Sequence, residues 1–322
     1  MRAAVVGGWH VHTMEYATAL QKNPGAELVC LWDDDKARGA ELAGKLGVPF
    51  VADVESIWAD PSIDGIQVTS ATGQHRDLMV AAAKAGKHIF TEKVLAFTVA
   101  EAEEIARAVR DSGVKFTISY PHKTQPALKA AKALADSGKL GQITYARVRD
   151  AHNGASGGWL PPYFFDEKQT GGGAMIDLGA HPMYTLHWLL GNPVSVVSQF
   201  TRVTGKDVED NAVSVLEYAD GAIGVSETGF VSVGNPYLLE ISGTRGSLLV
   251  HNGQLEYTLE ERGPDPAVQL QLPPADPMPI DAWIAAVNGE GEAPNGIDEA
   301  VALTRLMAAA YESARTGRKV AF

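Results

Sequence analysis

Cysteine and positive charge are both scarce in this sequence of 322 residues. Cys30 is the only cysteine, so no internal disulfide can form and a reducing compartment is expected. Lys and Arg number 27 against 39 Asp and Glu, and the net charge of −12 disfavours non-specific attraction to nucleic acid or anionic lipid. We therefore expect a cytoplasmic protein without a nucleic-acid partner.

Long apolar runs are also missing, and none approaches the roughly 20 residues of a membrane-spanning helix. Met1 and Arg2 lead straight into the apolar stretch Ala3–Val6, without the pattern of a secretory signal peptide. What is present is an ordinary globular composition, with 45% hydrophobic and 20% charged residues. The length suits about two domains of roughly 150 residues each, and we expect no membrane association.

The first 120 residues alternate short apolar runs with amphipathic stretches, which is typical of a parallel sheet covered by helices on both faces. This order predicts a doubly wound Rossmann domain over residues 1–120 that binds a nucleotide. The predicted strands are Ala3–Val6, Leu28–Leu31, Gly65–Val68, His88–Thr91 and Lys115–Ser119. The predicted helices are Thr13–Lys22, Lys36–Leu46, Arg76–Ala85 and Val99–Ser112.

Residues 121–322 have a different pattern, typical of an α+β domain with a large, mainly antiparallel open sheet and helices on one face. Asp220-Gly221 separates two of its short apolar runs and is a strong hairpin signal. The predicted elements are, in order, a helix at Pro126–Ser137, a strand at Gln142–Arg149, a loop over 151–172, a helix from about Ala174 to Leu190, short strands over 194–259, and helices at Ile280–Val287 and Ile297–Thr316.

The strand at Ala3–Val6 leads through Gly7-Gly8 into a helix. Dinucleotide sites use this geometry because the first N–H groups of the helix are free to bind a pyrophosphate. The full G-x-G-x-x-G pattern is absent, since Trp9 and His12 occupy the second and third glycine positions, and a turn that binds nothing is the alternative. The cofactor-binding residues that we expect here are Gly7, Gly8, Trp9, His10 and Val11.

Three acids, Asp33-Asp34-Asp35, follow the second predicted strand. A carboxylate at this place accepts hydrogen bonds from the adenosine ribose and repels a 2′-phosphate, so Asp33 favours NAD over NADP. We expect Asp34 and Asp35 to cap the following helix instead. His10 and His12 are two residues apart, which is not zinc-like spacing, and we predict no metal.

Several later segments have a characteristic order and spacing. They are Asp64–Ser70 with His75, Ala82–Lys93, Gly138–Ile143, Gly171–Pro182 and Glu312–Val320. In these segments the chain resembles the Gfo/Idh/MocA oxidoreductases, the group of glucose–fructose oxidoreductase and inositol dehydrogenase, and the similarity spans nearly the whole chain.

The resemblance implies a Rossmann domain followed by an α/β domain whose open sheet often forms oligomer contacts. Glu92-Lys93 matches the start of the family's Glu-Lys-Pro motif, with Val94 in place of proline, and Asp177 and His181 match its acid–histidine pair. Ala71-Thr72-Gly73 stands where a proline is usual. The further cofactor-binding residues that the resemblance implies are Thr69, Ser70, Ala71, His75, Glu92 and Lys93.

The three catalytic candidates are Lys93, Asp177 and His181. Oxidising an alcohol requires its hydroxyl proton to leave, and an imidazole suits this because its pKa lies near working pH. We expect Asp177 and His181 to share one face of a helix, where Asp177 orients His181 or holds the substrate. The Lys93 ammonium would stabilise developing alkoxide charge. The sequence leaves open which of Lys93 and His181 takes the proton, and we favour His181.

Substrate contacts are expected from the cleft end of the sheet and from the loop before the catalytic helix. Aromatic faces beside hydrogen-bonding groups suit a carbohydrate, although ordinary packing of the loop is the alternative. The candidates are His122, Lys123, Arg149, His152, Asn153, Trp159 and Tyr163.

Together these features predict an NAD-dependent dehydrogenase of a sugar, sugar derivative or cyclic polyol, forming a homodimer or homotetramer. One alternative is a glycoside-cleaving enzyme that oxidises its substrate transiently, with tightly retained NAD. Another is a non-catalytic sensor or regulator that binds a dinucleotide on the same fold.

Overall fold

The computed structural model describes residues 1–234, 236–262 and 268–322, and it divides into two compact units. Unit 1 comprises Met1–Tyr120 and Pro277–Thr304, and unit 2 comprises Pro121–Asp276 and Arg305–Phe322. The first division falls where the sequence pattern changes. The second domain was expected to span residues 121–322. Pro277–Thr304, however, belongs to unit 1, because this segment packs on the sheet of unit 1.

Unit 1 is built on a six-stranded parallel sheet with the strand order β3-β2-β1-β4-β5-β6. This order confirms the predicted doubly wound Rossmann fold, in which ligands bind at the carboxyl ends of the strands beside β1. The sequence pattern missed the two-residue strand β3 and the short helix α3 at Glu55–Ala59. The strands are β1 Arg2–Val6, β2 Glu27–Trp32, β3 Phe50–Val51, β4 Gly65–Val68, β5 His88–Thr91 and β6 Phe116–Ile118.

The main helices of unit 1 are α1 Thr13–Lys22, α2 Lys36–Leu46, α4 His75–Lys84, α5 Val99–Ser112 and α9 Pro279–Val287. The bounds of α1, α2 and α5 are those predicted, and side-chain caps fix the starts of α2 and α5. Asp35 accepts hydrogen bonds from two N–H groups at the start of α2. Thr98 and Glu101 form a reciprocal capping box at the start of α5, and Gly113 ends it in the left-handed conformation.

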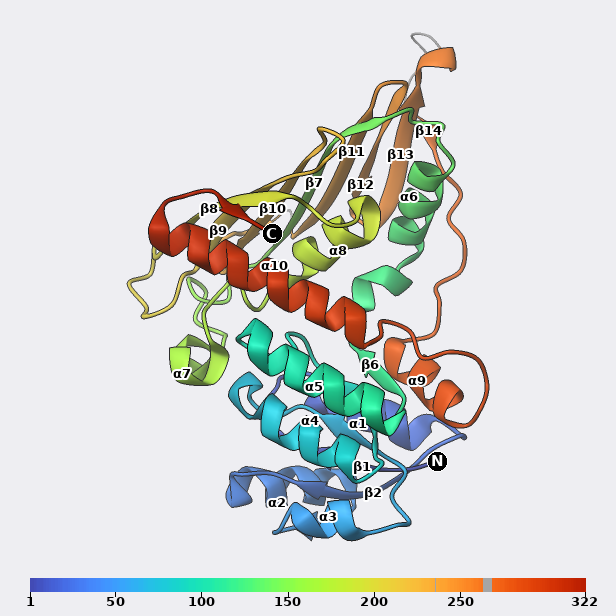
Figure 1. Ribbon diagram of the computed structural model, residues 1–322, viewed down its shortest axis with the longest axis vertical. Coiled ribbons are helices and arrows are strands. Elements are labelled where there is room, and N and C mark those ends of the chain that lie inside the picture. The colour runs from blue at the N-terminus through green and yellow to red at the C-terminus, as the bar shows by residue number, and fades with distance from the viewer. Residues whose placement is uncertain (235, 263–267) are drawn as a thin grey trace. The chain divides into compact units, whose positions relative to one another are not determined.

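The segment Pro277–Thr304 belongs to unit 1 because its helix α9 packs into the apolar core of that unit. Helices α1, α2 and α9 share this core with β1, β2 and β5, while α4 and α5 cover the opposite face of the sheet (Figure 1). Trp283 of α9 is fully buried, and its ring centroid lies 5.9 Å from that of Phe90 in β5. Full burial of one large apolar side chain stabilises a fold by roughly 1.5 to 3 kcal/mol, and Ile280 and Ile284 of α9 are buried in the same core.

Unit 2 contains a nine-stranded sheet with the order β14-β13-β12-β11-β7-β10-β9-β8-β15. Only β7 and β10 pair in parallel within this ladder; the other neighbours run antiparallel, as predicted. Asp220-Gly221 lies at the β9–β10 hairpin, with Gly221 at φ +88°. The strands are β7 Ile143–Ala151, β8 Ser195–Thr201, β9 Asn211–Glu217, β10 Ile223–Gly229, β11 Tyr237–Gly243, β12 Gly246–His251, β13 Gln254–Leu259, β14 Val268–Gln269 and β15 Val320–Ala321.

Helices cover one face of this sheet and leave the other open (Figure 1). They are α6 Pro126–Asp136, α8 Ala180–Leu190 and the part of α10 (Ile297–Thr316) from Arg305 onward, with the short α7 at Glu167–Thr170 in the long loop. On β9, side chains alternate between buried and exposed along the whole strand. Among the described residues, every helix is too short or too polar to cross a lipid bilayer.

The helix predicted from Ala174 is wrong in its first turn and a half. Residues 174–179 form consecutive turns, and α8 begins only at Ala180. Gly179 is packed so closely that a Cβ there would lie 2.4 Å from the carbonyl oxygen of Met175. Asp177 therefore lies in the turns that lead into α8 rather than on the helix, and it does not share a helical face with His181.

Candidate active site

The glycine turn after β1 brings the backbone of the chain against the end of β4. Gly7 has φ +89°, and a Cβ on it would lie 2.4 Å from the Cα of Ser70, so only glycine fits. The Thr69 hydroxyl donates to the Gly7 carbonyl at 2.6 Å, and the His10 N–H donates to the Thr69 carbonyl at 3.0 Å. The structure thus brings together Gly7, His10, Thr69 and Ser70 at the carboxyl edge of the sheet, as predicted.

This edge has the features that a dinucleotide requires. The Ser70 hydroxyl and the Gln74 side-chain carbonyl are buried without a hydrogen-bond partner among the described residues. Helix α1 starts at Thr13 without a side-chain cap from His12, which suits an anion at its N-terminus. Trp9 is buried and Val11 is 49% exposed, while Ala71 is buried before the 3-10 turn η1 at Thr72–Gln74. The residues present therefore fit a bound dinucleotide.

Asp33, at the end of β2, is 1% exposed and already has four hydrogen-bond donors. Its carboxylate accepts from the Gly8 N–H at 2.5 Å, from the Asp35 N–H at 2.7 Å, and from Arg38 Nε and Nη2 at 3.0 and 2.6 Å. Burial raises the pKa of Asp33, and the Arg38 guanidinium opposes that shift. Asp33 therefore ties the glycine turn to α2 through Arg38.

The two neighbouring acids of Asp33 have different roles. Asp35 caps α2, as predicted. The prediction that Asp34 caps the same helix is wrong, because its carboxylate binds Arg38 Nη2 at 2.9 Å and Gln74 Nε2 at 2.7 Å. The sequence reasoning missed Arg38, although its position one helical turn beyond three acids was a usable signal.

Glu92 and Lys93 follow β5 at the same edge of the sheet. Glu92 is 3% exposed, and its carboxylate accepts from the Tyr16 hydroxyl at 2.5 Å and from the Lys93 N–H at 2.9 Å. Burial opposes its charge, but the positive potential of His10 and Lys93 outweighs burial and lowers the pKa of Glu92. The Lys93–Val94 peptide bond is cis. Glu92 thus anchors the backbone from which the Lys93 side chain projects.

His75, expected to contact the cofactor, is a buried connector in this unit. Its Nδ1 lies 3.1 and 3.2 Å from the carbonyl oxygens of Val94 and Leu95, and its Nε2 lies 3.3 Å from that of Ser70. Complete burial lowers the pKa of His75. The ring therefore fixes the segment after Lys93 relative to Ser70.

A second cluster forms within unit 2 around His181. Its Nδ1 lies 2.9 Å from the Tyr184 hydroxyl, which also accepts from the His122 N–H at 3.3 Å. The rings of His122 and His181 stack at 4.4 Å, and His122 Nε2 lies 3.7 Å from an Asp150 carboxylate oxygen. Tyr237 meets His122 edge-on at 4.7 Å. The structure therefore pairs two predicted residues, His122 and His181, and adds three polar neighbours.

Alternation along β7 explains why Asp150 was missed and Arg149 was predicted. Arg149 lies on the open face of the sheet, where it donates to the Ser232 hydroxyl at 2.9 Å and faces Glu227 at 3.6 Å. Asp150, one residue later, points to the helix-covered face, toward His122. The structure does not bring Arg149 to the His181 cluster.

The other predicted substrate residues fall into two groups. His152 stacks on Phe230 at 5.0 Å and lies 4.6 Å from the ring of Trp159, whose indole N–H donates to Asn153 at 3.1 Å. Trp159 is 56% exposed, so one aromatic face meets solvent. Lys123 instead lies 5.8 Å from the ring of Trp188, and Tyr163 packs beside Phe164 in the turn η3, Pro162–Phe165.

Two groups of donor atoms in the described part of the chain are close enough to hold a metal ion. They are His10, His12 and Glu92 in unit 1, and His122, Asp150 and His181 in unit 2, each with donor atoms within 4.8 Å of one another. The sequence spacing did not reveal Glu92 as a neighbour of the two histidines. The expectation of no metal stays a prediction.

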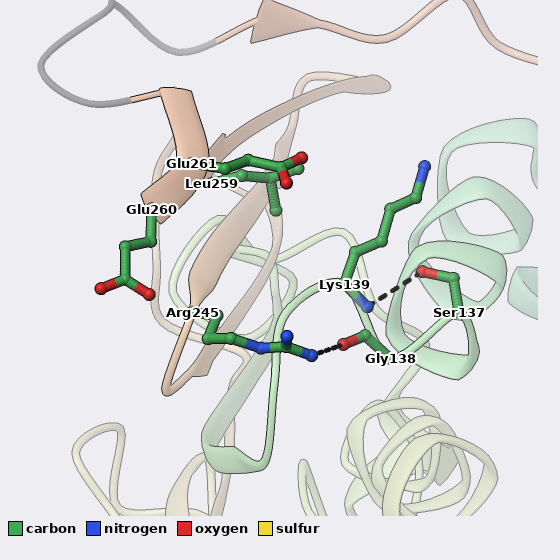
Figure 2. Close-up of a pocket in the computed structure, with 7 residues that line it drawn as sticks. All are labelled: Ser137, Gly138, Lys139, Arg245, Leu259, Glu260 and Glu261. Atoms are coloured by element: carbon green, nitrogen blue, oxygen red, sulfur yellow. Dashed lines mark hydrogen bonds between the residues drawn. The ribbon is translucent and has the colours of Figure 1, made fainter.

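A surface hollow of about 370 Å³ in unit 2 is separate from all predicted site residues. It is lined by the loop after α6, by Arg245 in the turn between β11 and β12, and by the end of β13 with the two glutamates that follow it (Figure 2). Figure 2 shows that Arg245 donates to the Gly138 carbonyl, at 2.8 Å, and that the Lys139 N–H donates to Ser137. Its two cations and two carboxylates form no catalytic grouping, and we assign it no role.

Two family models match the chain. Residues 1–120 match the model described as the oxidoreductase family, NAD-binding Rossmann fold. Residues 128–249 match the model described as the GFO/IDH/MocA C-terminal domain.

Individual relatives agree with these matches. The scyllo-inositol 2-dehydrogenase (NAD(+)) of Bacillus subtilis is 30% identical over 259 residues, covering 78% of this chain and 73% of the relative. The D-xylose 1-dehydrogenase (NADP(+)) 2 of Haloferax volcanii is 26% identical over 310 residues, covering 91% of each. An oxidoreductase from Agrobacterium radiobacter, solved with NAD+, L-tartaric acid and magnesium, has the same fold, with a TM-score of 0.85 at 21% identity over 100% of this chain and 98% of that one.

The sequence motifs, the strand orders of both sheets and these matches agree, and they confirm the resemblance inferred from the sequence. The chain belongs to the Gfo/Idh/MocA oxidoreductase family, with an NAD-binding Rossmann domain followed by the family's C-terminal domain.

Proposed function

We propose that this protein transfers a hydride between a nicotinamide cofactor and a hydroxyl carbon of a sugar, a sugar derivative or a cyclic polyol. The observation that carries the proposal is an imidazole, His181, held at one ring nitrogen by a tyrosine. It occurs in a chain whose glycine turn and Ser70 fit a dinucleotide. Relatives named for the oxidation of inositol and xylose belong to the same family.

Each catalytic candidate has a distinct task in this proposal. The bound nicotinamide would accept the hydride, which is chemistry that the protein itself lacks. His181 takes the hydroxyl proton at Nε2, because Nδ1 is engaged by the Tyr184 hydroxyl. The Lys93 ammonium binds the reacting oxygen and stabilises its developing negative charge. Asp177 holds a neighbouring substrate hydroxyl, because the two ring nitrogens of His181 are already assigned to Tyr184 and to the substrate proton.

We propose that the substrate is a carbohydrate or polyol that packs against Trp159. A half-exposed indole beside the Asn153 amide and the His152 ring offers an apolar face with polar groups at its edge. Sugars have apolar faces and polar rims, so they match this surface better than a purely apolar or purely charged ligand does.

We propose NAD as the preferred cofactor. A 2′-phosphate would bring negative charge toward Asp33 and Asp34, and Arg38 is already bound to both carboxylates. The family includes an NADP-dependent relative, so the preference must be measured. Titration should show NAD binding at least about tenfold more tightly than NADP, about 1.4 kcal/mol. Tighter binding of NADP would refute the assignment.

We also propose a homodimer or homotetramer formed through the open face of the unit 2 sheet. Neighbouring strands expose a patch of large aliphatic side chains on this face, at 39 to 47% exposure. Contiguous apolar surface of this kind marks interaction sites. The residues are Val197, Val213, Val215 and Ile223, on the adjacent strands β8, β9 and β10. Light scattering should give a mass of two or four chains, and Val215→Lys should shift it to one. The cytoplasmic location stays a prediction from the sequence.

A panel assay tests the central proposal. The purified protein is incubated with NAD or NADP and a panel of aldoses, sugar acids, glycosides and inositols, and the absorbance of the reduced cofactor is followed. We expect turnover of at least one compound, lost in His181→Gln. Cofactor binding without turnover of any compound would instead favour a sensor, and tightly retained NAD with glycoside cleavage would favour transient oxidation.

A further inference from the structure

A buried carboxylate outside the predicted site forms hydrogen bonds with the turns that lead into α8. Glu209, just before β9, is 5% exposed. Its Oε1 accepts from the N–H groups of Gly173 and Met175 at 2.9 and 3.0 Å and from the Tyr311 hydroxyl at 2.6 Å. Its own carbonyl oxygen accepts from the Ala174 N–H at 2.8 Å. One residue thus binds three successive N–H groups of a segment 34 to 36 positions earlier in the chain.

The contact leaves no space for a side chain, which explains the run of glycines. A Cβ on Gly173 would lie 1.9 Å from the Glu209 carbonyl oxygen, and a Cβ on Gly172 would lie 2.0 Å from the Tyr311 hydroxyl. Neither glycine has a positive φ, so close approach rather than backbone conformation requires them. The glycines, Glu209 and Tyr311 form one fitted assembly, which we name the Glu209 clamp.

The Glu209 clamp connects directly to the predicted catalytic residues. The Gly173 carbonyl accepts from the Asp177 N–H at 3.1 Å, and the Ala174 carbonyl accepts from the Gly179 N–H at 2.9 Å. Helix α8 starts at the next residue, Ala180, and carries His181 in its first turn. The position of the clamped peptide groups therefore determines where Asp177 and the start of α8 lie.

We propose that Glu209 is a positioning residue that holds Asp177 and His181 in their reactive arrangement by fixing the backbone of Gly173–Met175. The inference rests on the proposed function. It assigns Glu209 no contact with substrate or cofactor, and its effect passes through the backbone.

The chemistry of the clamp makes a specific demand on the side chain at position 209. All three side-chain bonds end on one acceptor oxygen, which a glutamine amide also provides. Burial raises the pKa of Glu209, and the hydrogen bonds from Tyr311, Gly173 and Met175 oppose that shift. Because a glutamine presents the same acceptor oxygen and a leucine does not, Glu209→Gln should keep the clamped backbone that Glu209→Leu loses.

Steady-state kinetics of four variants test the proposal. We expect Glu209→Leu to lower kcat about 100-fold, the effect of misplacing a reacting group by about 1 Å, with the Kd for NAD within about twofold of wild type. Glu209→Gln should stay within about threefold of wild-type kcat, and Tyr311→Phe should fall between the two. Asp210→Asn is the matched control, because Asp210 is equally buried but binds the N–H groups of Val203 and Thr204 in the β8–β9 loop. The kcat of Asp210→Asn should stay within about threefold of the wild-type value.

Amide hydrogen exchange supplies a readout that does not depend on turnover. In Glu209→Leu, exchange at Gly173–Asp177 should accelerate at least about tenfold, while unit 1 keeps its wild-type protection. If the wild-type protein turns over none of the compounds, the proposed function fails. The amide hydrogen exchange of Gly173–Asp177 still tests the Glu209 clamp in that case. If Glu209→Leu fails to fold, Tyr311→Phe carries the test with the same two readouts. Wild-type kcat in Glu209→Leu, equal damage in Glu209→Gln, or unchanged exchange would each overturn the proposal.

Discussion

The two candidate sites of this chain are built in different ways. In unit 1, Gly7, Asp33, Ser70 and Glu92 all lie where a parallel strand ends, so the topology alone brings them to one edge. In unit 2, His181 depends on turns fixed by a carboxylate that is remote in sequence. The comparison teaches that the proposed cofactor edge is specified by where the strands end, whereas the surroundings of His181 depend on contacts between residues distant in the chain.

The largest effect should come from removing the groups that handle the proton and the oxygen charge. His181→Gln and Lys93→Met should each lower kcat by about 10³-fold, within the range of general acid–base and electrostatic catalysis. NAD binding, measured by fluorescence quenching, should persist in His181→Gln because unit 1 is unaltered. Wild-type kcat in either variant would remove that residue from the mechanism.

Substitution of Gly7 tests whether the carboxyl edge of the unit 1 sheet requires a glycine in the turn after β1. Gly7→Ala must adopt φ +89° and place a Cβ 2.4 Å from Ser70, so we expect NAD affinity to fall at least about tenfold and the Tm to drop. Gly44→Ala in α2 is the control, because nothing lies within 4 Å of its added methyl group.

For the control, helix propensity predicts a gain of about 0.5–1 kcal/mol in the free energy of unfolding, with NAD affinity unchanged. Calorimetry and NAD titration measure both variants. If the two alanine variants behave alike, the turn is not a close approach and the account of this edge fails.

The same difference between local and long-range contacts explains which features could be predicted from the sequence. The bounds of α2 and α5 could be predicted because local caps, Asp35 and Thr98, fix where these helices start. Glu92 and Lys93 were identified from the family's sequence motif, which is a run of neighbouring residues. The start of α8 could not be predicted, since residues 174–179 are held in turns by Glu209, whose contacts leave no periodic pattern.

Two other differences have similar physical causes. Choosing Arg149 over Asp150 required the register of β7, because adjacent side chains of a strand face opposite sides of the sheet. The return of Pro277–Thr304 to unit 1 depends on Trp283 packing against Phe90, a contact between residues distant in the chain. Sequence pattern identifies the faces of single elements and does not identify their distant partners.

His122→Phe tests the cluster around His181 in unit 2, and we expect a smaller effect on kcat than from His181→Gln. Phenylalanine keeps a ring stacked on His181 but loses the approach to Asp150, which measures 3.7 Å. We expect kcat to fall about three- to tenfold while the Kd for NAD is unchanged, as measured by initial rates and cofactor titration. A wild-type kcat would show that packing alone explains His122.

The smallest effect is expected in the acid dependence of unit 1. The pKa of Glu92 is lowered in the folded protein, so its stabilising contribution is present above its ordinary pKa, about 4.5, and is lost as pH falls through the lowered value. Denaturant unfolding should therefore show wild type to be more stable than Glu92→Gln at about pH 5.5. The difference should shrink below about pH 4.5. A difference that grows on acidification would contradict the assigned charge.

The most direct measurement is a crystal structure with NAD and a compound that the panel assay shows to be turned over. The account predicts a substrate hydroxyl within hydrogen-bond distance of His181 Nε2, and the dinucleotide bound against Gly7 and Ser70. A substrate bound out of reach of His181 would contradict the account.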